Sequence, residues 1–196
     1  MRVVVRVQEI HSRQYNSRVM SILKVARMGH PVLRAKARPL EKADLKGVAV
    51  QRLIDDMIDT MVEYHGVGLA APQVHEGLRI FVASLNIDED EGSDSDPEPI
   101  ALINPEISVV GSDVVEEWEG CLSIPDVRGR VPRAREIRLR ALDRSGGRLE
   151  LLAHDFSARV IQHEADHLDG VLFFDRMRSF ETLTFLDEYS RYWAKD

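Results

Sequence analysis

The sequence predicts an α+β fold, in which helices and sheet strands do not alternate along the chain. Apolar residues recur with helical spacing in two long segments and in the tail, whereas several segments between them read as strands. A wound parallel sheet would require a regular strand–helix–strand order, and that order is absent from the sequence. At 196 residues the chain has the length of one ordinary domain.

The first twenty residues differ in composition from the rest. They carry four arginines against one acid, Glu9, which is typical of organelle transit peptides. They lack the serine-rich length of such a peptide, so an upstream start codon, with Met20 as an alternative start, is the favoured interpretation. We therefore expect residues 1–20 to be an N-terminal extension whose role the sequence does not assign, and 21–196 to be a single domain.

The first helix is predicted near residues 50–66. Its apolar residues are spaced i, i+3, i+4, i+7, i+8 and i+11, which places them on one face of a helix. They are Val50, Leu53, Ile54, Met57, Ile58 and Met61.

Four strands are predicted after this helix. Residues 78–85 and 101–110 read as two of them, joined by an acidic loop at 88–99. Residues 136–142 alternate apolar and basic side chains, as a half-buried strand does. The turn residues of 143–148 then predict a hairpin into a strand over 149–156.

Two further helices are predicted near the end of the chain. The second helix begins near Asp155, a candidate N-cap, and ends around Gly170. The third covers 180–193, with one side formed by Phe180, Leu183, Leu186, Tyr189 and Trp193.

Composition excludes several classes of protein. The single cysteine, Cys121, cannot form an intramolecular disulfide and favours a reducing compartment. Seven acids lie within 88–99, so the rest of the chain is close to neutral although the net charge is −7. This balance leaves no broad basic face for nucleic acid, and no apolar run reaches the roughly 18 residues of a membrane span.

The segment HEADH, at 163–167, is the strongest chemical signal. On a helix His163 and His167 lie on one face and can reach the same metal ion, with Glu164 beside them to exchange protons with water. The apolar stripe of the helix continues through these histidines, which argues against a solvated face. A catalytic site usually takes a third protein ligand.

Cys121 is the candidate third ligand. No histidine follows His167, and the downstream carboxylates show no recognisable ligand pattern, so the ligand is expected upstream. The segment EGCLSIP brackets Cys121 with Gly120 and Pro125, which predicts a loop of the kind that carries functional sites. The segment GVGLAAPQV adds Gln73, whose amide can donate to a developing oxyanion, although a tight turn explains that segment equally well.

Taken together, these motifs resemble those of peptide deformylases. GVGLAAPQ, EGCLS and HEADH occur in the order and approximate spacing found in that family, and the similarity extends to ARMGHPVLR, IPDVRGRVPR and QHEADHLDGVLFFDRM. The resemblance covers most of 20–177. It implies a catalytic domain over 21–196, with mixed and antiparallel sheets packed around a central metal-binding helix and a C-terminal helix.

The resemblance also implies a role for individual residues. Cys121, His163 and His167 would bind the metal, Glu164 would act as acid and base, and Gln73 with the backbone N–H of Leu122 would form the oxyanion hole. The substrate would lie as an added strand along Val67, Gly68 and Gly120, near Arg128, with its methionine side chain between Phe156 and Val160.

The function implied is removal of the formyl group from the N-terminal formyl-Met of nascent polypeptides, with release of formate. The resemblance favours one iron(II) ion per chain, with zinc or nickel as alternatives. It implies the bacterial cytoplasm, or an organelle if 1–20 belong to a transit peptide. The expected partners are nascent peptides and, through a weak contact, the ribosome; no DNA or membrane binding is expected.

Three other interpretations stay open. Another HExxH metal amidase or peptidase would share these histidines and the glutamate. A non-catalytic binding protein on the same fold would be expected to lack Glu164, Gln73 or Cys121, and all three are present. A closed structural metal site needs a fourth ligand, for which the other histidines lack a recognisable spacing.

Glu119 and Asp166 are candidates for orienting the ligands, and a structural salt bridge explains each equally well.

Overall fold

The computed structural model describes residues 21–85 and 97–194. The predicted extension at 1–20 and most of the predicted acidic loop lie outside these residues. The strands are β1 (Gly68–Ala70), β2 (Ile80–Ser84), β3 (Pro99–Val109), β4 (Val114–Cys121), β5 (Ile124–Ala134), β6 (Glu136–Leu142), β7 (Arg148–His154) and β8 (Thr184–Phe185). The helices are α1 (Lys42–Leu45), α2 (Val48–Glu63), α3 (Asp155–Leu168) and α4 (Leu186–Tyr192), with short 3₁₀ helices at Pro31–Arg34, Ala71–Val74 and Phe173–Arg176.

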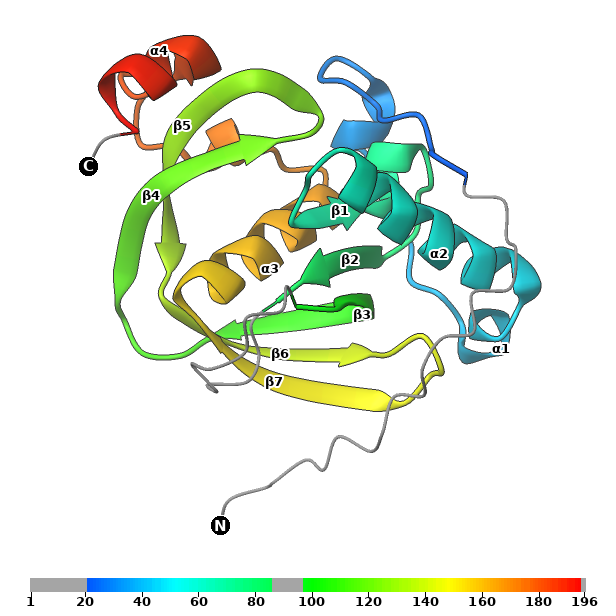
Figure 1. Ribbon diagram of the computed structural model, residues 1–196. Helices are drawn as coiled ribbons and strands as arrows, with labels where there is room; N and C mark the ends of the chain where they lie inside the picture. Colours follow the sequence, from blue (N-terminus) through cyan, green and yellow to red (C-terminus); the bar gives the residue numbers. More distant parts are fainter. Residues whose placement is uncertain (1–20, 86–96, 195–196) are drawn as a thin grey trace.

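Two antiparallel sheets organise the fold. The larger has the strand order β1-β2-β3-β6-β7, and the smaller has the order β4-β5-β8. Helix α3 runs through the middle of the molecule between the larger sheet and the curved β4–β5 hairpin (Figure 1). The predicted α+β class, with sheets around a central helix, is confirmed.

Helices α2 and α3 cover opposite faces of the larger sheet. Because side chains alternate along a strand, Phe81 of β2 packs with Ile161 of α3, whereas Val82 packs with Met57 of α2. A third apolar cluster lies around the β4–β5 hairpin and includes Phe173 and Cys121. The metal-binding helix predicted from the sequence is therefore buried between two layers.

Helix α2 and the strands β2, β3, β6 and β7 lie where the sequence predicts them. The hairpin of β4 and β5 was not predicted, and the EGCLSIP segment is its tip rather than a free loop. Its strands carry many charged residues, some of them exposed and others, such as Glu119 and Arg133, buried in ion pairs, so the apolar alternation that marks a strand is weak there.

Helix α3 lies where it is predicted, but the predicted N-cap of this helix and the predicted start of the last helix are wrong. His154 is the N-cap of α3, whereas Asp155 is its first residue, has a positive φ of 46° and pairs with Arg135. The tail is helical only from Leu186, because Thr184 and Phe185 pair with β5 as strand β8. Thr184 and Phe185 therefore pair with a sheet edge, although the apolar spacing around them is that of a helix.

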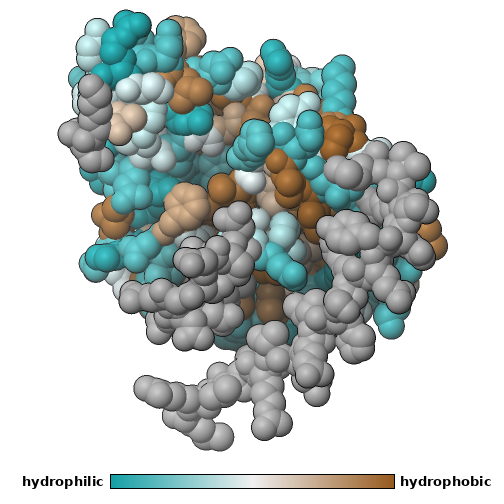
Figure 2. All heavy atoms as spheres, in the orientation of Figure 1, coloured by the Kyte–Doolittle hydropathy of each residue, from teal (hydrophilic) through white to brown (hydrophobic). Residues whose placement is uncertain are grey.

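The surface is mixed in character. Figure 2 shows apolar surface gathered near the centre of one face and hydrophilic residues around it. Within 21–85 and 97–194, every helix is too short or too polar to cross a lipid bilayer.

Candidate metal centre and its pocket

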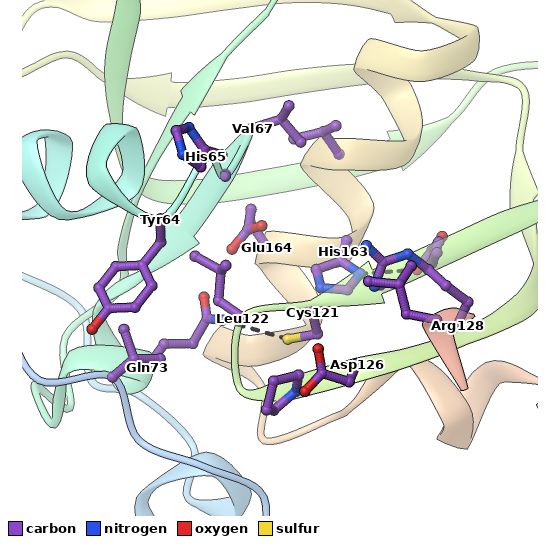
Figure 3. A pocket seen from close by; sticks show the side chains of 18 of the residues that line it. Tyr64, His65, Val67, Gln73, Cys121, Leu122, Asp126, Arg128, His163 and Glu164 are labelled. Carbon is purple, nitrogen blue, oxygen red and sulfur yellow. Dashed lines mark hydrogen bonds and ion pairs between the residues drawn. The ribbon is translucent and has the colours of Figure 1, made fainter. Parts of the chain in front are cut away.

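Cys121, His163 and His167 form a buried cluster. Figure 3 shows two of them, Cys121 and His163, beside each other. One ligand atom from each of the three lies within 4.8 Å of the others, and Cys121 Sγ is 3.2 Å from His167 Nε2. Within 21–85 and 97–194, no other group of three such side chains has ligand atoms this close, so the remaining histidines stay outside the cluster.

Two elements position these ligands. His163 and His167 are one helical turn apart on α3, on the buried face that packs between the sheets. Cys121 ends strand β4, where the pairing with β5 shifts register between Glu119 and Cys121. This irregularity turns the end of β4 toward the helix, which is consistent with the usual effect of such a bulge on side-chain direction.

A network of charged side chains fixes the orientation of His163 through its Nδ1 atom. Glu119 accepts from His163 Nδ1 at 2.8 Å, which directs Nε2 toward the cluster. Arg133 donates to Glu119 at 2.9 and 3.1 Å and to Asp166 at 2.6 Å, and Arg159 also donates to Glu119. Burial would raise the pKa of Glu119, but the His163 and Arg133 contacts outweigh it and lower that pKa to about 2.

The donor set suits a soft divalent metal ion. Burial alone would raise the pKa of Cys121, yet the two neighbouring imidazoles hold that pKa well below its usual range and so favour the thiolate. A thiolate and two imidazoles are ligands that bind zinc, iron, cobalt or nickel. The residues present therefore fit a metal ion.

Glu164 lies beside the cluster as a buried carboxyl group. It is 4% exposed, burial raises its pKa to about 7, and its Oε2 has no hydrogen-bond partner among the described residues. Gly68 of β1 leaves the space for it, because a Cβ at that position would overlap Glu164 Oε1 and lie 2.8 Å from Cγ and Cδ. A side chain of this pKa, aimed at the cluster, can both accept and return a proton near neutral pH.

The side chain of Gln73 points toward Cys121, and Figure 3 draws the contact between them as a dashed line. Its Oε1 accepts from the N–H of Ala70 at 2.7 Å, so its Nε2 must face inward, 3.5 Å from Cys121 Sγ and 3.3 Å from Ser123 Oγ. A buried amide that is oriented in this way presents an N–H donor to a reacting oxygen near the cluster.

A pocket of about 610 Å³ opens from the cluster to the surface. Apart from the deeply buried His167, all the site residues predicted from the sequence line it. They are Val67, Gly68, Gln73, Gly120, Cys121, Leu122, Arg128, Phe156, Val160, His163 and Glu164. The Arg128 side chain occupies the space that a Cβ at Gly120 would take.

Two edge strands flank this pocket. Gly68 belongs to β1, the outer strand of the larger sheet, and Gly120 belongs to β4, the outer strand of the smaller one. Edge strands present unpaired backbone groups, to which an extended peptide can add as a further strand.

The sequence did not single out several residues at this site. Arg133 and Arg159 bind Glu119, Ser123 contacts Gln73, and Trp118 and Leu186 line the pocket. Ser123 follows Cys121 within the same motif and could have been found there. Nothing in the sequence sets Arg133 apart from its neighbouring arginines, because only the fold brings it to Glu119 and Asp166.

Comparisons with known proteins agree with this geometry. The family model described as Polypeptide deformylase matches residues 22–182. "Peptide deformylase 2" of Nostoc sp. is 40% identical over 175 residues, which are 89% of this chain and 97% of that protein. "Peptide deformylase" of Salinibacter ruber is 46% identical over 163 residues, 81% of this chain and 82% of that protein.

Solved structures give the same result. The class I type b peptide deformylase of Acinetobacter baumannii with Met-Ala-Ser bound superposes with a TM-score of 0.74 at 35% identity, covering 81% of this chain and all of that one. The peptide deformylase of Ehrlichia chaffeensis superposes with a TM-score of 0.72 at 32% identity, covering 83% and 91% of the two chains. The chain therefore belongs to the polypeptide deformylase family.

Proposed function

We propose that this chain hydrolyses the formyl group from the N-terminal formyl-Met of peptides and releases formate. The observation that carries the proposal is the convergence of Cys121, His163 and His167 beside the buried carboxyl of Glu164, at the inner end of a pocket flanked by edge strands. The binding of Met-Ala-Ser to the related Acinetobacter baumannii enzyme supports a peptide substrate of this kind.

Cys121, His163 and His167 would hold one divalent ion per chain, with iron(II) as the native ion and zinc or nickel as replacements. A bound ion of this type supplies Lewis acidity and lowers the pKa of water. Glu119 fixes the orientation of the His163 ring through Nδ1, as outer ligand partners commonly do.

Glu164 carries the proton in the proposed reaction. It takes a proton from water as the water oxygen bonds to the formyl carbon, and returns it to the amine nitrogen as the C–N bond breaks. The products are formate and a free amino terminus. Gln73 Nε2 and the backbone N–H of Leu122 donate to the oxygen that becomes negative during this step.

The substrate would pair with both edge strands, along Val67 and Gly68 on one side and Gly120 on the other. Its methionine side chain would lie against Phe156 and Val160, which line the pocket from α3. Arg128, whose side chain covers Gly120, lies near the path of the peptide.

Paired substrates test the proposal directly. Formyl carries only a hydrogen on its carbonyl carbon, whereas acetyl carries a methyl that would displace the carbonyl from the Gln73 and Leu122 donors. A simple apolar slot discriminates between two substrates that differ by one methyl by about 1–3 kcal/mol of activation free energy. The loss of transition-state contacts by the acetyl substrate adds to this difference. In competition assays on matched tripeptides, formyl-Met should react at least about 100-fold faster than acetyl-Met, and faster than formyl-Gly. Equal kcat/KM for formyl and acetyl would favour a general amidase.

The cellular context belongs to the same proposal. Because the relatives named above are bacterial, we assign the chain to the bacterial cytoplasm, with nascent peptides as substrates and a weak ribosome contact. An organelle is the alternative if residues 1–20 are a transit peptide. Fractionation of cells that express the full chain would separate these locations.

A further inference from the structure

The C-terminal segment reaches the pocket that contains the metal cluster. Strand β8 pairs with β5, with Phe185 opposite Val127 and Thr184 opposite Arg128. The next residue, Leu186, is half-buried and lines the same pocket as Gln73, Cys121 and Glu164. Figure 1 shows α4 lying over the β4–β5 hairpin, at the C-terminal end of the chain.

Aromatic contacts hold α4 in this position. The ring of Trp118, on β4, lies 5.0 Å from the ring of Tyr189 and 5.6 Å from that of Trp193, measured between centroids. No residue of α4 is fully buried, so these aromatic contacts and the β8 pairing attach the helix to the hairpin. The helix therefore stands beside the pocket without contributing to the apolar core.

The position of α4 along β4 indicates which part of a substrate it would meet. Cys121 marks the inner end of the pocket, and Trp118 lies three residues earlier on β4, about 10 Å away at roughly 3.3 Å per residue. A peptide that pairs with β4 at Gly120 and has its reacting end at Cys121 must extend toward Trp118. A second hollow of about 550 Å³ shares Asp126 and Leu186 with the pocket, and its other lining residues belong to β8 and α4.

We propose that Leu186 is a specificity-determining residue that contacts the side chains of the substrate residues following formyl-Met. This inference rests on the proposed function. Its half-buried isobutyl group lines the pocket at the start of α4, whose later residues Tyr189 and Trp193 contact Trp118, so the C-terminal segment would favour apolar residues there over small ones. The preference for methionine itself belongs to the inner part of the pocket and would not depend on Leu186.

Three substrates and two leucine variants test this proposal. The substrates are formyl-Met amide, formyl-Met-Ala-Ala and formyl-Met-Leu-Leu. In the wild type, kcat/KM should be higher for the Leu-Leu than for the Ala-Ala peptide. Leu186→Ala should reduce this ratio by about 3- to 10-fold, the effect of removing a few partly buried carbon atoms, and should change kcat/KM for formyl-Met amide less than kcat/KM for the Leu-Leu peptide.

Leu183→Ala is the matched control. It removes the same atoms from the same segment, but Leu183 lines neither hollow, so the ratio should stay at the wild-type value. Trp118 and Trp193 are the two tryptophans of the chain, so tryptophan fluorescence reports whether α4 remains in contact with the hairpin in each variant.

The outcomes separate the two proposals. Absence of formate release from every substrate by the metal-loaded wild type would overturn the proposed function. An active wild type with equal ratios in the wild type and both leucine variants would overturn the role of Leu186 alone.

Leu186→Lys provides a second test, because a cation there should raise kcat/KM for formyl-Met-Glu-Glu relative to formyl-Met-Leu-Leu. An unchanged order of these two peptides would also contradict the proposal.

Discussion

Glu164 and Cys121 lie side by side in the structure, but they should affect different measurements. Glu164 is not a proposed ligand, whereas Cys121 Sγ faces the centre of the cluster. Glu164→Gln should therefore retain one metal ion per chain and lose about 10²–10⁴-fold in kcat, the usual contribution of a positioned acid and base. Cys121→Ala should lose the metal as well.

Metal analysis of anaerobically purified protein, together with formate release, checks this separation. His75→Ala is a suitable control, because His75 is exposed and outside the cluster. A full complement of metal in Cys121→Ala would remove the thiol from the ligand set, and near-normal turnover by Glu164→Gln would show that another base operates.

The absence of a side chain at Gly68 is a second testable feature. A methyl there would overlap the Glu164 carboxyl, so Gly68→Ala should displace Glu164 and reduce kcat by at least about 10-fold with little change in metal content. Gly77→Ala is the control, since a Cβ at Gly77 meets no atom within 4 Å. Steady-state kinetics on both variants would test this, and full activity of Gly68→Ala would show that Glu164 can move aside.

For single residues, the sequence predicts most of the candidate site, because the chemically important side chains lie in short motifs. The i, i+4 spacing of His163 and His167 is a local property of a helix, and one cysteine leaves no ambiguity about which thiol is available. The partners of Glu119 could not be predicted, because Arg133 and Arg159 come from different elements that meet only in the folded chain.

Among the elements, the β4–β5 hairpin depends on buried charge. Arg133 on β5 links Glu119 on β4 to Asp166 on α3, and the exposed fraction of its side chain is 5%. Arg133→Met should remove one hydrogen-bond partner from each of the buried carboxylates Glu119 and Asp166 and reduce the free energy of unfolding by about 3 kcal/mol. This value is near the lower end of the usual cost of breaking a buried ion pair, because both carboxylates keep other partners.

Arg135→Met is the matched control for Arg133→Met. Arg135 pairs with Asp155 in an ion pair that is more than half exposed on both sides, so this change should cost less than about 1 kcal/mol. Denaturant unfolding of both variants gives the comparison. Equal losses would mean that the network around Glu119 does not stabilise the hairpin.

Helical and strand patterns of apolar residues predicted α2, α3 and four of the strands. They failed for the β4–β5 hairpin, where charged side chains interrupt the alternation, and for Thr184 and Phe185, which fall within a helical pattern but pair with β5. In both places a pairing partner distant in sequence decides the local structure, and a local pattern carries no information about that partner.

On the scale of the whole molecule, the acidic segment should be dispensable for the fold. Strands β2 and β3 are antiparallel neighbours, with Ser84 opposite Pro99, so the ends that the segment joins already lie close together. Replacing residues 87–96 with a short glycine-rich turn should change the melting temperature by less than about 5 °C and kcat by less than about twofold.

A full-length variant in which the acids of 88–96 are changed to amides would separate charge from length. If that variant matches the wild type and the shortened chain unfolds, the segment is needed to span the connection. The same assays on residues 21–196 would test the proposal that this range is one complete catalytic domain.

The two edge strands beside the pocket also bear on when the enzyme can act. A peptide that fills the gap between β1 and β4 must expose both of its backbone edges over its first few residues. An amino terminus already wound into a helix or paired within its own protein cannot do this. Deformylation and folding of the client protein would therefore compete in time, and proteins whose amino terminus folds early should keep more of their formyl groups when the enzyme is scarce.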